Sequence, residues 1–162
     1  MWGKRKSKPL ETGSQAPSFK LKSIDGDTQS LEDILAKGPA VLAFFKVSCP
    51  VCQLALPYLE RLSASTKLQL VAISQDDAAA TGGFRQRFGI TFPTLLDQAN
   101  EGYPASNAFG ITSVPSLFLV ENDGEIANSS AGFSKKDLEA LGSRAGIQTF
   151  RPEDNVPEWK AG

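Results

Sequence analysis

Two cysteines are the residues of this chain whose type and spacing could do chemistry. Cys49 and Cys52 enclose Pro50 and Val51, and they follow an apolar run, 40–45, that is long enough to cross a sheet buried on both faces. A helical pattern of leucines comes next, so a helix is predicted to begin at the cysteines. The free N–H groups and the positive dipole end of a helix start stabilise a thiolate, the nucleophile of disulfide exchange. The pattern therefore predicts a redox-active dithiol/disulfide pair.

Each position around the pair has an expected role. Cys49 lies nearer the exposed helix start, so we expect it to attack a partner disulfide, and Cys52, one turn further in, to resolve the mixed disulfide. Pro50 and Val51 lie between the sulfurs and are expected to influence the reduction potential. Lys46 could lower a thiol pKa or could simply extend to solvent at a strand end. The alternative for the two cysteines is a pair of buried thiols or a static bond.

Composition excludes several classes of function. The chain has 162 residues, a formal net charge of −1, two cysteines and no histidine. Its size predicts one domain. Cys–His catalysis is impossible within this chain, and two thiolates would supply only half of the ligands of a typical zinc site. The charge balance argues against nucleic acid as a partner. We therefore expect no metal and no cofactor beyond the disulfide of Cys49 and Cys52.

The segment that contains Cys49 and Cys52 resembles the active-site strand–turn–helix of the thioredoxin superfamily. It is most similar to the redoxin branch, which includes TlpA-like thiol-disulfide oxidoreductases and alkyl hydroperoxide reductase/thiol-specific antioxidant proteins. Pro57 stands where these proteins kink the active-site helix. Residues 112–119 resemble the family's cis-proline loop and the strand after it, and residues 13–19 resemble its entry segment. The spacing from Cys49 to the proline loop is too long for a minimal thioredoxin, which favours the redoxin branch.

The resemblance implies an α/β fold of the thioredoxin-like, three-layer kind. The central sheet would be mixed, with helices on both faces, an N-terminal hairpin and a redoxin-type insertion. Pro115 would be cis and lie against the disulfide, and the Val114 backbone would offer hydrogen bonds to a bound partner. The implied function is exchange of the Cys49–Cys52 pair with protein disulfides, together with an unknown electron donor or acceptor. We further expect a monomer, without nucleic acid or a membrane span.

Some positions depart from the family pattern. Ala43 stands where thioredoxins have a buried aspartate, and Ala55 where several TlpA-like reductases have a glutamate. Those carboxylates are associated with proton transfer at the resolving thiol, so no residue is assigned to that role for Cys52. Glu60 and Asp97 are expected to be surface charges.

Two other functions remain open. The first is a thiol-dependent peroxidase of the peroxiredoxin kind. Peroxiredoxins need a Pro-x-x-x-Thr-x-x-Cys loop, in which threonine and backbone donors polarise the peroxide. Seven and three residues before Cys49 this chain has Leu42 and Lys46, and before Cys52 it has Phe45 and Cys49, so neither register fits. The third possibility is a non-enzymatic binding or chaperone module, with a vestigial cysteine pair or one that holds a soft metal such as Cu(I).

Three parts are expected along the chain. Residues 1–12 are a flexible basic tail, 13–144 the thioredoxin-like domain, and 145–162 an extension that is either held on the surface by Phe150 and Trp159 or disordered. No apolar run is long enough to span a bilayer, and no intact signal peptide is present. We therefore expect a soluble protein, with a cytoplasmic location favoured over export with a removed leader.

Alternation, capping residues and turn residues place the remaining elements. Ser30 and Ser134 are predicted to cap helices. Gly82 and Gly83 weaken the predicted helix 76–88 by up to about 1 kcal/mol each, and could break it. The expected strands are 19–24, 28–30, 40–45, 68–74, 92–97, 116–121 and 125–129, and the further helices are 31–36, 104–109 and 134–144. The strands 40–45 and 68–74 should run parallel, with the last hairpin antiparallel to them.

Overall fold

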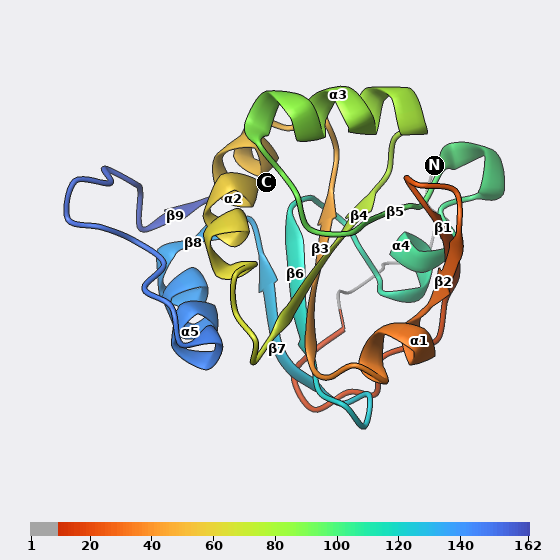
Figure 1. Cartoon of the computed structure of the whole chain (residues 1–162), viewed down its shortest axis with the longest axis horizontal. Helices are drawn as coiled ribbons and strands as arrows, with labels where there is room; N and C mark the ends of the chain where they lie inside the picture. Colours follow the sequence, from red (N-terminus) through yellow and green to blue (C-terminus); the bar gives the residue numbers. More distant parts are fainter. Residues whose placement is uncertain (1–9) are drawn as a thin grey trace.

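A seven-stranded mixed sheet lies between two layers of helices in the computed structural model, which describes residues 10–162 (Figure 1). The strand order is β2-β1-β5-β4-β3-β6-β7. The strands are β1 Lys20–Ser23, β2 Thr28–Ser30, β3 Ala40–Phe45, β4 Gln69–Ser74, β5 Thr94–Leu96, β6 Ser116–Val120, β7 Ile126–Ala131, β8 Phe133–Ser134 and β9 Trp159–Lys160. The helices are α1 Leu31–Leu35, α2 Pro50–Leu62, α3 Ala78–Phe88, the short 3-10 helix η1 Ala99–Glu101, α4 Pro104–Ala108 and α5 Lys135–Ala145.

Strand β3 is the centre of the sheet, and all six of its residues are buried. It pairs in parallel with β4 and antiparallel with β6, which confirms the expected mixed sheet. Successive side chains point to opposite faces of a strand. Val41, Ala43 and Phe45 therefore join one core, and Ala40 and Leu42 join the other. The continuous apolar run exists because helices cover both faces.

The two cores show which helices cover which face. Leu56 of α2, Phe84 of α3 and Leu138 of α5 belong to one core, and Ile34 of α1 and Ala105 of α4 belong to the other. Figure 1 shows α2 and α5 to the left of the central strands and α1 and α4 to the right, with α3 lying across the top. This arrangement confirms the predicted three-layer α/β fold.

Helix α3 runs without a break through Gly82 and Gly83. Asp77 caps its start and accepts a hydrogen bond from the Ala80 backbone N–H at 2.8 Å. Phe84, next to the glycines, is buried with its ring centroid 4.9 Å from that of Phe45. The capping bond and this aromatic packing offset the helix-weakening effect of the two glycines, which is about 1 kcal/mol each.

Asp97 is fully buried, so its expected place as a surface charge is wrong. Its two carboxylate oxygens accept hydrogen bonds from the Ala105 N–H at 2.9 Å, the Ser106 N–H at 2.7 Å and the Ser106 hydroxyl at 2.6 Å. The first N–H groups of a helix have no partner within it, so a buried helix start needs an acceptor from elsewhere in the chain. Asp97 supplies it and thereby ties α4, part of the segment inserted before the proline loop, to the end of β5.

Of the two aromatic residues expected to hold the chain after α5 on the surface, Phe150 packs on the domain. Phe150 is buried and its ring centroid lies 4.8 Å from that of Tyr58, whereas the Trp159 side chain is 61% exposed. The sequence did not predict β8 and β9, which pair with each other. The domain boundaries stay a prediction, and residues 1–9 of the expected basic tail lie outside the described residues.

Replacing Asp97 with asparagine should lower the free energy of unfolding by about 1–3 kcal/mol, because the amide group would turn a donor toward buried backbone donors. Urea denaturation followed by circular dichroism measures the loss. Asp25→Asn is the matched control, since Asp25 is exposed and should show no change. Equal stability of the two variants would contradict the role assigned to Asp97.

Candidate active site

The cysteine pair lies where β3 ends and α2 begins. Cys49 is the N-cap of α2, and its sulfur accepts a hydrogen bond from the Cys52 backbone N–H at 3.1 Å. Pro50 occupies the first helical turn, where its missing N–H leaves no bond unmade. The helix therefore begins at the cysteines, as predicted, and its start points toward the Cys49 sulfur.

The two sulfurs have different environments. Both are free thiols, Cys49 half-buried and Cys52 fully buried. Burial raises the pKa of the Cys52 thiol, and its hydrogen bond with Cys49 acts in the same direction. A backbone hydrogen bond at Lys46 opposes this rise in the Cys52 pKa, and the negative charge of Asp76 adds to it. Cys52 is thus held as a thiol at neutral pH, while Cys49 is the sulfur that solvent can reach.

The loop before β6 brings Val114 and Pro115 to the same place. The Val114–Pro115 peptide bond is cis, as the family resemblance implies. The Cys49 thiol donates to the Val114 carbonyl oxygen at 3.5 Å, and Pro115 is buried. The Pro115 carbonyl accepts a hydrogen bond from the Gly132 N–H at 2.8 Å, which ties this loop to the end of β7. The Val114 carbonyl thus lies directly beside the half-buried sulfur.

The remaining predicted site residues surround the pair without all facing the sulfurs. Val51 packs into the core and Pro50 is exposed, so the two residues between the cysteines face opposite environments. The Lys46 carbonyl accepts from the Cys49 N–H at 3.3 Å. Within residues 10–162 the Lys46 ammonium makes no hydrogen bond or ion pair, so a role in tuning a thiol pKa stays a prediction.

Asp76 is a site residue that the sequence interpretation missed. Its carboxylate accepts a hydrogen bond from the Val47 N–H at 2.8 Å, and Gln53 donates to the Val47 carbonyl at 3.0 Å. These bonds hold the loop between β3 and the cysteines. The available signal was topological: β3 and β4 are parallel with Phe45 opposite Ser74, so the residues that follow each strand share one edge of the sheet.

Among residues 10–162, no group of three or more His, Cys, Asp or Glu side chains could hold a metal ion. In the same range no helix is long and apolar enough to cross a lipid bilayer.

Comparison with known proteins agrees with this site. Residues 12–129 match the model of the AhpC/TSA family. The chain belongs to the AhpC/TSA family. The thiol-disulfide oxidoreductase ResA of Geobacillus kaustophilus is 31% identical to this chain, over 80% of this chain and 75% of ResA. The thioredoxin-like protein YneN of Bacillus subtilis is 31% identical over 83% of this chain and 81% of its own length.

A solved structure confirms the fold of this AhpC/TSA protein. The thioredoxin domain of the thiol-disulfide oxidoreductase BVU-2223 from Bacteroides vulgatus superposes with a TM-score of 0.73 at 21% identity. The match covers 83% of this chain and 97% of that one. At this identity the likeness shows the fold alone, and the fold is the thioredoxin-like one that the sequence resemblance implies.

Iodoacetamide should modify the reduced, folded protein at Cys49 and leave Cys52 unmodified at pH 7–8. The reagent reacts with thiolate, and each unit by which burial raises the Cys52 pKa removes about tenfold of its thiolate. We expect a rate difference of more than about tenfold, measured by mass spectrometry of the two labelled positions. In denaturant both cysteines should react at similar rates. Equal labelling in the folded protein would contradict the assigned difference.

Proposed function

We propose that this protein is a thiol-disulfide oxidoreductase that exchanges its Cys49–Cys52 dithiol/disulfide with disulfides of other proteins. The observation that carries the proposal is the asymmetry of the pair. A reachable sulfur at the helix start accepts a backbone N–H, and a fully buried thiol lies one turn away. Nucleophile and resolving group need these two environments. The ResA relative is a named thiol-disulfide oxidoreductase, which supports the same activity here.

The reaction would proceed in two exchange steps. The Cys49 thiolate attacks one sulfur of the partner disulfide, the partner S–S bond breaks, and the released partner sulfur takes up a proton. The Cys52 thiol then loses its proton and attacks the Cys49 sulfur, which frees the second partner sulfur as a thiol. The partner disulfide is thereby reduced to two thiols and the protein dithiol is oxidised to a disulfide. The reverse sequence would oxidise a partner.

The loop around the cis bond supplies a surface for the partner. Val114 presents its carbonyl oxygen 3.5 Å from the Cys49 sulfur, so a polypeptide pairing with this loop would bring its disulfide to Cys49. Pro115, the buried residue of that loop, accepts a hydrogen bond from the Gly132 N–H that holds the loop in place. The proposal extends to a cytoplasmic monomer that acts on protein disulfides with a separate electron donor or acceptor, and size-exclusion chromatography tests the oligomeric part.

Hydrogen peroxide is the substrate that distinguishes this proposal from a peroxidase, because a peroxidase of the same family would use the same cysteine. The reduced protein is mixed separately with hydrogen peroxide and with a protein disulfide, and the second-order rate of Cys49 oxidation is measured. We expect fast oxidation by the protein disulfide and slow oxidation by peroxide, since neither cysteine follows the threonine-containing loop that polarises a peroxide. The opposite order would overturn the proposal, and slow oxidation by both would favour a binding module.

Substituting one cysteine at a time should separate the two roles. Cys49→Ser should reduce exchange with a protein disulfide to the rate without enzyme, because the attacking sulfur is gone. Cys52→Ser should still attack and should accumulate a mixed disulfide of one partner per protein, because the resolving thiol is gone. Non-reducing electrophoresis and intact mass spectrometry measure the adduct. An adduct that forms on Cys49→Ser instead would reverse the assignment.

A further inference from the structure

The last residues of the sequence lie against the active site. Gly162 packs on the Val114 carbonyl oxygen, the same atom to which the Cys49 thiol donates. A Cβ on Gly162 would overlap that oxygen, so the close approach depends on the absence of a side chain. Figure 1 shows the C end of the chain beside the first turn of α2. The segment 159–162, here called the terminal segment, therefore covers the carbonyl beside the half-buried Cys49 sulfur.

Backbone pairing holds the terminal segment in place. Trp159 and Lys160 form β9 and pair antiparallel with Ser134 and Phe133 of β8. Just before β9, the Glu158 carbonyl accepts a hydrogen bond from the Lys135 N–H at 2.9 Å. The segment is thus bound as an added strand, which is a common way for proteins to bind an extended peptide.

A second glycine permits this pairing. Gly132 has φ +75°, and a Cβ built on it would lie 2.5 Å from the Lys160 carbonyl oxygen and 3.3 Å from the Gly162 nitrogen. Side chains are therefore absent at both points where the terminal segment approaches the loops of the site. The backbone of the terminal segment thus comes into close contact with the loops of the site at two glycines, Gly132 and Gly162.

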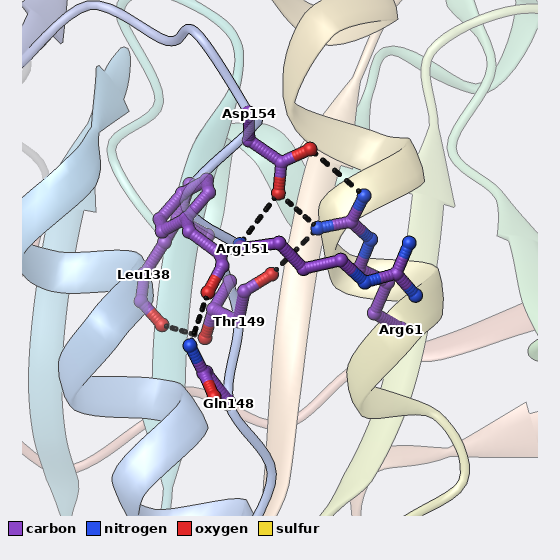
Figure 2. A network of polar contacts seen from close by, with 7 residues as sticks. Arg61, Leu138, Gln148, Thr149, Arg151 and Asp154 are labelled. Carbon is purple, nitrogen blue, oxygen red and sulfur yellow. Dashed lines mark hydrogen bonds and ion pairs between the residues drawn. The ribbon is translucent and has the colours of Figure 1, made fainter.

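The chain leading to the terminal segment is anchored firmly (Figure 2). The Asp154 carboxylate accepts from both terminal nitrogens of Arg61 at 2.6 and 3.2 Å, and from the Arg151 N–H at 2.7 Å. Arg61 also donates to the Thr149 carbonyl at 2.9 Å, and the pKa of Asp154 is lowered to about 2 by its bonds to Arg61 and Arg151. This charge pair persists at neutral pH. It fixes residues 149–154, here called the base of the terminal segment, on α2.

The terminal segment itself is held more weakly than its base. Trp159 is 61% exposed, and all four residues of the segment are exposed. The ion pair beside it, Lys135 with Glu158 at 3.7 Å, is on the surface and contributes little. Segments with few buried contacts open at low free-energy cost. The segment can therefore leave the site while its anchored base keeps it close.

We propose that residues 159–162 occupy the surface beside Val114 on which a substrate polypeptide must pair, so that they select between protein disulfides and small disulfides. The inference rests on the proposed exchange activity. Because the segment is tethered, its effective concentration at the site is in the millimolar range, and a weak contact is enough for it to compete with an incoming polypeptide. A polypeptide needs the Val114 surface and must displace the segment, whereas a small disulfide needs only access to the half-buried Cys49 sulfur. The segment lies outside residues 12–129, the part of the chain that matches the family model.

Gly162→Val tests the proposal directly, since the new side chain cannot fit against the Val114 oxygen. The reduced protein is assayed with insulin as the protein disulfide and with hydroxyethyl disulfide as the small one. If the open state holds roughly a tenth to a third of the molecules, the variant should reduce insulin about three- to tenfold faster. Its rate with hydroxyethyl disulfide should stay unchanged.

Matched variants separate this effect from a general one. Ala161→Val adds the same kind of side chain at an exposed position and should behave like the unmodified protein. Asp154→Asn loosens the anchor and should raise the insulin rate in the same direction as Gly162→Val. Equal insulin rates for all four proteins would overturn the proposal and leave the exchange activity standing. Absence of exchange with both disulfides would instead refute the proposed function.

Hydrogen exchange gives a readout that does not depend on turnover. Cys52→Ser protein is trapped as a mixed disulfide between Cys49 and a cysteine-containing peptide. The Lys135 amide, which is bonded to the Glu158 carbonyl in the free protein, should then exchange faster because the terminal segment has been displaced. Capping Cys49 with a small thiol is the control and should leave this amide protected. Unchanged protection with the peptide would show that both can bind together, against the proposal.

Discussion

The hydrogen bond from the Cys52 backbone N–H to the Cys49 sulfur is the contact on which the site depends. It exists because Cys49 is the N-cap of α2. Only a short turn separates this helix start from Phe45, the last residue of β3. One helical turn then separates a sulfur at the surface from a sulfur in the core. That single turn leaves Cys49 accessible and buries Cys52, whose pKa is raised by that burial, and two-step disulfide exchange uses both environments.

Three loops from the same edge of the sheet complete the site. The turn after β3 carries the cysteines, the turn after β4 carries Asp76, and the loop before β6 carries the cis bond at Pro115. Bonds between these loops hold them together: Asp76 receives the Val47 N–H, and the Val114 carbonyl receives the Cys49 thiol. The inserted segment before the proline loop is fixed in turn by the buried carboxylate of Asp97.

Residues 149–162 add a constraint at the rim of the site. A firmly anchored base, with Phe150 in the core and Asp154 bonded to Arg61, leads to an exposed strand that reaches the Val114 carbonyl. The anchor is strong and the contact at the site is weak. An incoming polypeptide can therefore displace the exposed strand while the rest of the fold stays unchanged. Specificity would then be set at the rim of the site, with the cysteines unchanged.

The sequence by itself determined the elements whose signals are local. The buried run 40–45, the caps at Ser30 and Ser134, and the helix start at the cysteines each depend on neighbouring residues, and the structure has them where they were predicted. The resemblance to redoxins added the cis bond at Pro115, which no local pattern would predict.

Only the tertiary structure decided the features that depend on what lies opposite. Asp97 has the sequence context of a surface charge, and it is buried because α4 folds back and brings two backbone N–H groups to it. Helix α3 stays continuous through its two glycines because Phe84 packs on Phe45. Residues 159–162 carry no periodic signal, since the pairing of β9 with β8 is made by backbone groups that every residue has. Contacts of this kind are absent from sequence patterns because they join segments far apart in the chain.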